Sequence, residues 1–92
     1  VIRVRVFVPG QGIIEDPATG SAAAALGGYL AARESAANGK FSFLLEQGFE
    51  IKRPSFIELE VEKKDGEVSA VRVGGSAVMV SEAIMEIPLP LD

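Results

Sequence analysis

The sequence contains neither cysteine nor histidine, and these two absences exclude several kinds of site. Without cysteine the chain cannot form disulfides, zinc–thiolate sites, iron–sulfur clusters or a cysteine nucleophile. Without histidine it lacks the commonest general base and the commonest metal ligand, and no His-dependent triad can form. Enzymes that depend on either side chain within this stretch are therefore excluded.

Basic charge, tryptophan and long apolar runs are also scarce. Nine basic residues stand against thirteen acidic ones, a formal charge of −4. Nucleic-acid-binding proteins usually show a basic surplus, and base stacking needs aromatic side chains, so we predict no nucleic-acid partner. No apolar run reaches the roughly 18–20 residues of a membrane span, so we predict no membrane partner. The opening residues do not resemble a signal peptide, which together with the missing cysteines predicts a cytoplasmic protein.

The length and the balance of residue types predict one small folded domain over residues 1–92. The chain is 48% hydrophobic and 24% charged, which is ordinary globular composition. It opens directly in a strand-like pattern. We therefore expect either a piece of something longer or a chain that completes itself with a partner.

Periodicity and turn residues predict an α+β domain with a mainly antiparallel sheet. Strict apolar alternation predicts strands, and the alanine-rich stretch predicts a helix that stops at Asn38–Gly39. Asp65–Gly66 and Gly74–Gly75 predict tight turns. The expected strands are 2–8, 41–46, 56–63, 67–73, 77–80 and 83–87, and the expected helix is 20–37. Residues 10–22 are expected to form a long loop running into the helix start.

The small side chains of the expected helix suggest a narrow enclosure. Its first two turns carry no charge, so we expect that end to be buried all round. Gly27 and Gly28 each cost about 1 kcal/mol relative to alanine inside a helix. We expect another backbone to approach closely there, as in a curved sheet around a central helix.

The polar, glycine-punctuated stretch 10–22 is the most informative part of the chain. Free backbone amides and the positive end of the helix dipole predict an anion site at the start of the helix. Gly20 and Ser21 have little side-chain bulk, and the Ser21 and Thr19 hydroxyls could bind the same ligand. Asp16 is a candidate proton donor or acceptor at the mouth of the site. The alternative is that Asp16 or Thr19 simply caps the helix, which is the commoner use of such residues.

Other charged residues give weaker signals. Glu58, Glu60 and Glu62 could suggest a metal site, but side chains at strand period more often line a solvated face. Arg3 and Arg5 are expected either to face solvent or to pair with those glutamates. Residues 47–48 and 52–55 look like turns. Arg53 is the best candidate there for holding a substrate carboxylate.

Several segments together resemble the phenazine-biosynthesis (PhzF-like) isomerase family. They are Arg5–Pro9, Gly12–Ile13, Glu15-Asp16-Pro17-Ala18-Thr19-Gly20-Ser21-Ala22-Ala23, Gln47–Gly48, Arg53-Pro54-Ser55 and Val73-Gly74-Gly75-Ser76-Ala77-Val78. They follow the expected order over most of the chain. The match covers the later part of the second domain of that family.

The resemblance implies a fold related to diaminopimelate epimerase, in which two similar domains each wrap a curved sheet around a central helix. It implies that Asp16 is the active-site aspartate of the second domain and that Gly20 and Ser21 contact the substrate. The implied reaction is a proton shift on a small carboxylate-bearing molecule, without metal or cofactor. The cysteine-free sequence fits this carboxylate branch of the fold. The family's main acid/base, a glutamate, and a histidine come from the first domain, so half of the site is expected outside this chain.

Two functions are therefore considered, beside a third option, a purely structural remnant of the family. One is a PhzF-like isomerase domain that carries half of an active site, with stand-alone activity doubtful. The other is a non-catalytic small-anion-binding or self-assembling module on the same scaffold. Missing strands would leave sheet edges and apolar surface exposed. We therefore expect a homodimer or a complementing chain to supply the missing sheet.

Overall fold

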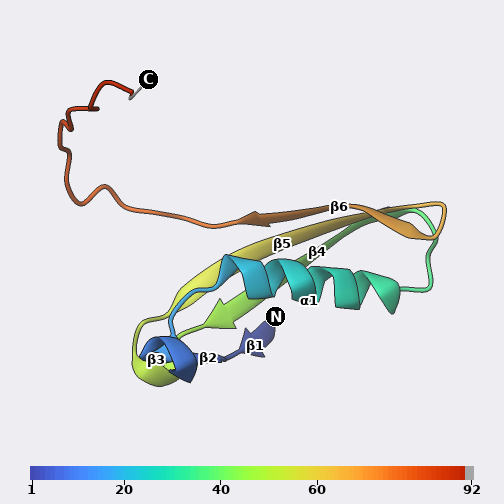
Figure 1. Ribbon diagram of the computed structural model, residues 1–92. Helices are drawn as coiled ribbons and strands as arrows, with labels where there is room; N and C mark the ends of the chain where they lie inside the picture. Colours follow the sequence, from blue (N-terminus) through green and yellow to red (C-terminus); the bar gives the residue numbers. More distant parts are fainter. Residues whose placement is uncertain (91–92) are drawn as a thin grey trace.

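The computed structural model of the protein describes residues 1–90. One α-helix, α1 (Gly20–Ala32), lies along one face of a four-stranded sheet (Figure 1). The sheet has the order β1 (Ile2–Val4), β4 (Gly39–Gln47), β5 (Ser55–Lys64), β6 (Glu67–Gly74). A separate two-stranded sheet joins β2 (Val6–Val8) to β3 (Ile13–Asp16), and short 3₁₀ turns span Pro9–Gln11 and Phe49–Ile51. The larger sheet is mixed, because β1 pairs with β4 in parallel while the other pairs are antiparallel.

The meander from β4 to β6 confirms the sequence prediction. Ile57, Leu59 and Val61 alternate along β5 toward the helix, and each is buried. Asp65 and Gly66 both adopt positive φ angles, of 52° and 82°, as a two-residue hairpin turn requires. The predicted face of Glu58, Glu60 and Glu62 is the opposite side of this strand.

The predicted strand 2–8 is broken at Arg5, which belongs to no strand. The residues before it join β4, and the residues after it pair with β3, a strand that lies where a loop was predicted. The Arg5 guanidinium forms an ion pair of 2.7 Å with Glu15, which secures β2 to β3 just beyond the break. Alternation alone could not reveal this break, because both halves keep the same apolar and polar order.

The helix is shorter than predicted, since it ends at Ala32 rather than Ala37. The groups that follow bind the β5–β6 hairpin instead of continuing the helix. The buried Lys63 ammonium donates to the Glu34 carbonyl at 2.8 Å, and the Asn38 side chain accepts from the Asp65 amide at 3.1 Å. Gly39, with φ of 140°, then turns the chain into β4.

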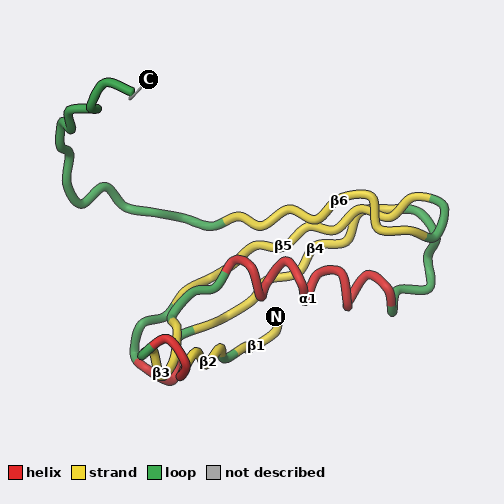
Figure 2. The backbone as a smooth tube through the Cα atoms, viewed as in Figure 1, coloured by secondary structure: helices red, strands yellow, loops and turns green. Residues whose placement is uncertain are grey.

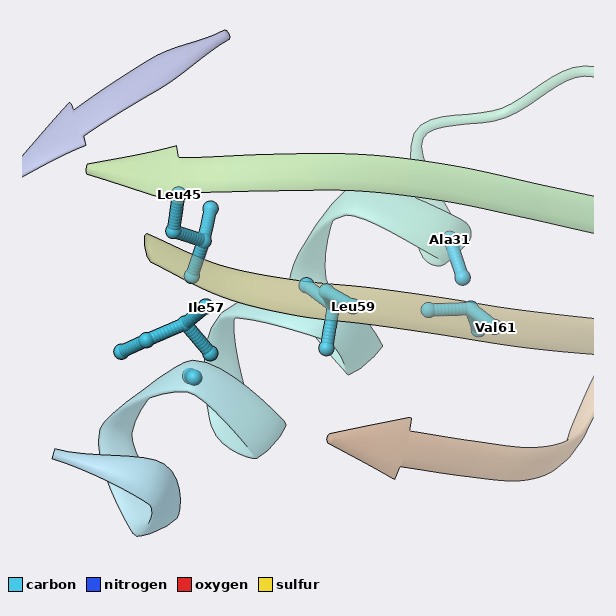
Figure 3. Close-up of a cluster of buried hydrophobic side chains, with 6 residues drawn as sticks. Ala31, Leu45, Ile57, Leu59 and Val61 are labelled. Atoms are coloured by element: carbon cyan, nitrogen blue, oxygen red, sulfur yellow. The ribbon is translucent and has the colours of Figure 1, made fainter. Parts of the chain in front are cut away.

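The core lies between one face of α1 and the sheet. The buried residues of α1 are Ala23, Gly27 and Ala31, at four-residue spacing. Ala23 and Ala31 belong to one cluster with apolar side chains of β4 and β5, and Figure 3 shows Ala31 with these side chains. A Cβ added to Gly27 would lie 3.0 Å from Leu59 Cδ1, whereas one on Gly28 would meet nothing within 4 Å. The predicted close approach is therefore found at Gly27, to side chains rather than to backbone, and is absent at Gly28.

The opposite side of α1 is open among the described residues. Ser21, Ala25 and Tyr29 are exposed, so the prediction that the first turns are buried all round is wrong for this part of the chain. The four-stranded sheet covers one side of the helix and does not enclose it.

Residues 75–90 form an extended tail that leaves the body of the domain (Figure 2). The strands predicted at 77–80 and 83–87 are not formed, because no strand among residues 1–90 lies beside them to share hydrogen bonds. Val80 is 88% exposed and Ile84 is fully exposed. The radius of gyration is 17.3 Å, against about 12 Å for a compact chain of this length.

Candidate functional site

The candidate site is built where β3 runs into α1. Asp16 is the last residue of β3, and Thr19 is the N-cap residue of the helix. The Thr19 hydroxyl donates to Asp16 Oδ2 at 2.5 Å. Neither side chain caps the helix, so the capping alternative for Asp16 and Thr19 is wrong.

The missing side-chain cap leaves the start of α1 open. The first amide bonded within the helix is that of Ala23, which donates to the Thr19 carbonyl at 3.2 Å. The amides of Gly20, Ser21 and Ala22 donate to no group among residues 1–90. Because these donors stand at the positive end of the helix dipole, they suit a carboxylate or phosphate.

Gln47, the last residue of β4, is the polar side chain that ties this loop to the sheet. It is 1% exposed and makes three hydrogen bonds. Its Nε2 donates to the Asp16 carbonyl at 2.9 Å and to Thr19 Oγ1 at 3.0 Å, and its Oε1 accepts from the Thr19 amide at 3.2 Å. A buried glutamine with this many partners holds residues 16–19 in one arrangement.

From the sequence, Gln47 is expected to be part of a turn, and this role is not predicted. A signal was present, because Gln47 follows Phe43 and Leu45 at strand period and so falls on the apolar side of its strand. A glutamine side chain buried on that side costs free energy unless its amide forms hydrogen bonds. Its partners lie 28 and 31 residues earlier in the chain, so local pattern could not name them.

Gly48 places the next segment against the same loop. Its φ of 84° is left-handed, and the Arg53 amide donates to its carbonyl at 2.9 Å. A side chain here would overlap the Arg53 carbonyl oxygen and would stand 2.8 Å from the Pro17 carbonyl oxygen. Only glycine lets these three stretches of backbone meet.

A pocket of about 430 Å³ opens beside the start of the helix. It is lined by Ala18, Gly20, residues 54–57 and residues 73–76. Three segments quoted for the family resemblance, which are far apart in the sequence, therefore meet around one hollow. Of the predicted site residues, Gly20 lines this pocket, whereas Asp16, Thr19, Ser21 and Arg53 do not.

The four predicted site residues that do not line the pocket differ in how they are connected to it. Thr19 and Ser21 flank Gly20, and Asp16 is held by Thr19. Arg53 is exposed, and its backbone amide binds Gly48. That Arg53 holds a substrate carboxylate stays a prediction.

The glutamates of β5 form a charged outer face. Arg72 contacts Glu60 at 3.0 Å and Glu62 at 2.8 Å, and Lys40 lies 3.5 Å from Glu62. The hydrogen bond from Arg72 lowers the pKa of Glu62 and in turn raises the pKa of Arg72. Among residues 1–90, no group of three acidic side chains is arranged to hold a metal ion.

The two N-terminal arginines do not use these β5 glutamates. Arg3 contacts Glu46 at 3.3 Å and Glu50 at 3.5 Å, and Arg5 binds Glu15. The hydrogen bond from Arg5 to Glu15 raises the pKa of the arginine. Of the two alternatives for Arg3 and Arg5, pairing with the β5 glutamates is not found, and both side chains are nearly half exposed while they contact other glutamates.

No helix within residues 1–90 has the length and apolar character needed to cross a membrane.

Comparison with known proteins gives consistent matches. The sequence model of the family described as phenazine biosynthesis-like protein matches residues 1–83. An uncharacterized isomerase of Mesorhizobium japonicum is 44% identical over 80 residues, covering 87% of this chain and 26% of that protein. An uncharacterized isomerase of Clostridium acetobutylicum is 42% identical, covering 87% of this chain and 27% of its own length.

A third relative carries a more specific name. The trans-2,3-dihydro-3-hydroxyanthranilate isomerase of Pseudomonas aeruginosa is 41% identical over 80 residues, which cover 87% of this chain and 28% of that enzyme. The chain thus spans about a quarter of the length of the curated relatives it matches.

Proposed function

Because the chain belongs to the phenazine biosynthesis-like protein family, we propose that it supplies one half of an isomerase active site. The reaction is a proton shift on a small carboxylate-bearing molecule, without metal or cofactor. The observation that carries the proposal is the pocket at the start of α1, where the separate family segments converge beside three open amides. Relatives named isomerase support the reaction class.

Each predicted residue has a role in this proposal. The substrate carboxylate binds the amides of Gly20 and Ser21, with Arg53 as a further donor, and Thr19 borders this site while its hydroxyl holds Asp16. Asp16 gives or takes the proton. A proton shift breaks one C–H bond and forms another, so it needs a positioned acid and base but no oxidant. A dihydro-hydroxyanthranilate is the first substrate to test, since one relative is named for it.

The proposal includes the fold and the source of the other half of the site. We assign the domain to the diaminopimelate epimerase-like class, in which further strands would cover the open side of α1. A first domain or a complementing chain would supply the glutamate and histidine expected from the family resemblance. Cytoplasmic localisation stays a prediction from the sequence.

The second candidate is a self-assembling or anion-binding module. The exposed apolar tail favours association, because side chains such as Val78, Val80 and Ile84 are more than four-fifths exposed. In this case copies of the chain, as a homodimer, cover the open side of α1. Ligand binding without proton exchange would distinguish this module from the isomerase.

The isomerase is tested by incubating the protein with trans-2,3-dihydro-3-hydroxyanthranilate in deuterated water and following deuterium incorporation by NMR. We expect incorporation above the uncatalysed rate, a large loss in Asp16→Asn, and loss of binding in Gly20→Leu, whose side chain would enter the pocket. Gly10→Leu, in the 3₁₀ turn Pro9–Gln11 where an added side chain meets nothing within 4 Å, is the matched control because Gly10 does not line the pocket. Exchange at the uncatalysed rate in the unsubstituted protein would overturn catalysis by this chain alone.

Binding is measured separately, by titrating anthranilate as a carboxylate probe and following the backbone amide signals. Shifts at Gly20 and Ser21, lost in Gly20→Leu, are the expected result. Binding that survives Asp16→Ala and Ser21→Ala together with Gly20→Leu would place the anion elsewhere.

A further inference from the structure

Gln47 lies at the end of β4, between its partners Val4 of β1 and Ser55 of β5. It does not line the pocket, and its side chain is removed from solvent. Its side-chain hydrogen bonds go to the backbone groups of Asp16 and Thr19 and to the Thr19 hydroxyl. Its polar influence on the site therefore runs through these two residues.

The orientation of the Gln47 amide follows from its backbone partners. A backbone N–H can only donate and a backbone carbonyl can only accept. The atom that faces the Thr19 amide must be Oε1, and the atom that faces the Asp16 carbonyl must be Nε2. The amide is therefore held in one of its two possible flips.

This orientation decides where the Thr19 hydroxyl proton points. Thr19 Oγ1 accepts from Gln47 Nε2, so its single proton has to be donated to another group. That group is Asp16 Oδ2. Asp16 Oδ2 thus accepts from the Thr19 hydroxyl, and Oδ1 has no hydrogen-bond partner within residues 1–90.

We propose that Gln47 is a positioning residue that acts through Thr19 to orient the Asp16 carboxylate and reserve Oδ1 for proton transfer. The proposal rests on the acid–base role given to Asp16 above. Gln47 sets the donor direction of the Thr19 hydroxyl, and the hydroxyl holds the carboxylate. The hydrogen bonds run in one direction: Gln47 Nε2 donates to Thr19 Oγ1, and the Thr19 hydroxyl donates to Asp16 Oδ2.

Four variants test this in the full chain. Thr19→Ser keeps the hydroxyl and Thr19→Val keeps the shape without it. Gln47→Glu keeps the shape but replaces the Nε2 donor with a carboxyl oxygen, which as a carboxylate cannot donate to Thr19, and Gln47→Met removes all three hydrogen bonds. Gln11→Glu, at an exposed position, is the control for the same change of charge. Circular dichroism and urea unfolding establish that each variant is folded.

With the substrate-exchange assay, we expect Thr19→Val and Gln47→Glu each to lower kcat about tenfold or more while KM changes little. This is part of the roughly 10²–10⁴-fold that a positioned acid or base contributes. Gln11→Glu should stay within about threefold, and Thr19→Ser, which keeps the hydroxyl, should lose less kcat than Thr19→Val. The double variant Gln47→Glu/Thr19→Val should lose no more than Thr19→Val alone, because both changes break one path. Losses that add, or an active Thr19→Val, would overturn the proposal.

A second readout does not depend on activity. The ¹³C signal of the Asp16 carboxyl carbon should move in Thr19→Val, Gln47→Glu and Gln47→Met and stay in place in Thr19→Ser and Gln11→Glu. Suppose that the signal moves in those three variants and not in the two controls, but the unsubstituted protein incorporates no deuterium above the uncatalysed rate. Then the orientation of Asp16 by Gln47 stands and the proposed isomerase fails. If Gln47→Met leaves the signal unchanged, the positioning role is wrong even in an active protein.

Discussion

The carbonyl oxygen of Pro17 lies 2.8 Å from the place that a Cβ atom on Gly48 would occupy. The loop that carries Asp16 and Thr19 and the turn after β4 are therefore packed backbone to backbone. Gln47 holds the same loop from the preceding position, by side-chain hydrogen bonds. Gln47 and Gly48 thus hold residues 16–19 in different ways. Gln47 does so through side-chain hydrogen bonds, and Gly48 does so because the absence of a side chain lets the two backbones pack closely.

Replacing Gly48 with alanine should be strongly destabilising. Gly66 is the matched control, because its φ of 82° is nearly the same as the 84° of Gly48 but a Cβ there would meet nothing within 4 Å. Gly66→Ala should cost only the backbone strain, about 1–2 kcal/mol. Gly48→Ala adds the overlap with Arg53 and Pro17, typically a further 1–3 kcal/mol. Equal urea midpoints for the two variants would contradict this packing.

The two adjacent glycines of α1 should respond differently to replacement by alanine. Gly28→Ala should stabilise by up to about 1 kcal/mol, because alanine is the better helix former and the space is open. At Gly27 the new methyl group would press on Leu59, Val61 and Val71 at 3.0–3.2 Å. Gly27→Ala should therefore be at least about 1 kcal/mol less stable than Gly28→Ala. Urea unfolding of both variants measures the difference, and a Gly27→Ala protein as stable as Gly28→Ala would refute the close contact.

The ion pair between Arg72 and Glu62 should make stability depend on acid pH. Arg72 lowers the pKa of Glu62 below its usual 4.5, so the folded state favours the charged carboxylate. The resulting stabilisation is present above that usual value and is lost as the pH falls through the lowered one. Arg72→Gln should therefore unfold at lower urea than the unsubstituted protein at pH 7, with the two midpoints converging as the pH falls below 4.5.

Two controls accompany that measurement. Lys64→Gln removes the same charge from a side chain that makes no ion pair within the described part of the chain, and it should show no such convergence. Added salt should shrink the Arg72→Gln effect at pH 7, since the pair faces solvent. A difference that persists unchanged at pH 3 would point to packing of the arginine stem instead.

The apolar tail should govern association. Val80→Ser with Ile84→Ser removes apolar surface that is 88% exposed at Val80 and fully exposed at Ile84, so the stability of the body should change little. Light scattering at micromolar concentration should show the unsubstituted protein as a dimer or larger and the double variant shifted toward monomer. Val68→Ser, at a partly exposed position on β6, is the control for loss of surface hydrophobicity. A monomer in both cases would contradict the self-assembling candidate.

The sequence predicted those parts of the fold whose cause is local. The alternation of Ile57, Leu59 and Val61 predicts a strand, and the pair Asp65–Gly66 predicts a hairpin turn, from neighbouring residues alone. Both predictions are confirmed. The prediction of strands at 77–80 and 83–87 is wrong because its cause is not local. Their residues favour extended backbone, but a strand exists only beside a partner, which propensity does not supply.

The candidate site shows the same division. Family segments pointed to Gly20 and the loop before it, and Gly20 lines the pocket. Gln47 was missed because its partners are distant in the chain, and the capping alternative for Thr19 failed because that hydroxyl is engaged by Asp16. A single hydroxyl with several possible partners cannot be assigned from sequence, since the choice depends on which groups the fold brings near.

The parallel pairing of β1 with β4 bears on the order in which the protein folds. The β5–β6 hairpin closes across a two-residue turn, whereas the β1–β4 contact joins residues 43 positions apart, such as Arg3 and Glu46. Contacts between distant residues form later, because closing a longer loop costs more chain entropy. Nascent chains should therefore form the β4–β6 meander first and dock β1 last. The hydrogen bonds of Gln47 to Thr19 and Asp16 join groups 28 and 31 positions apart, so by the same rule they would form after the hairpin and before β1 docks.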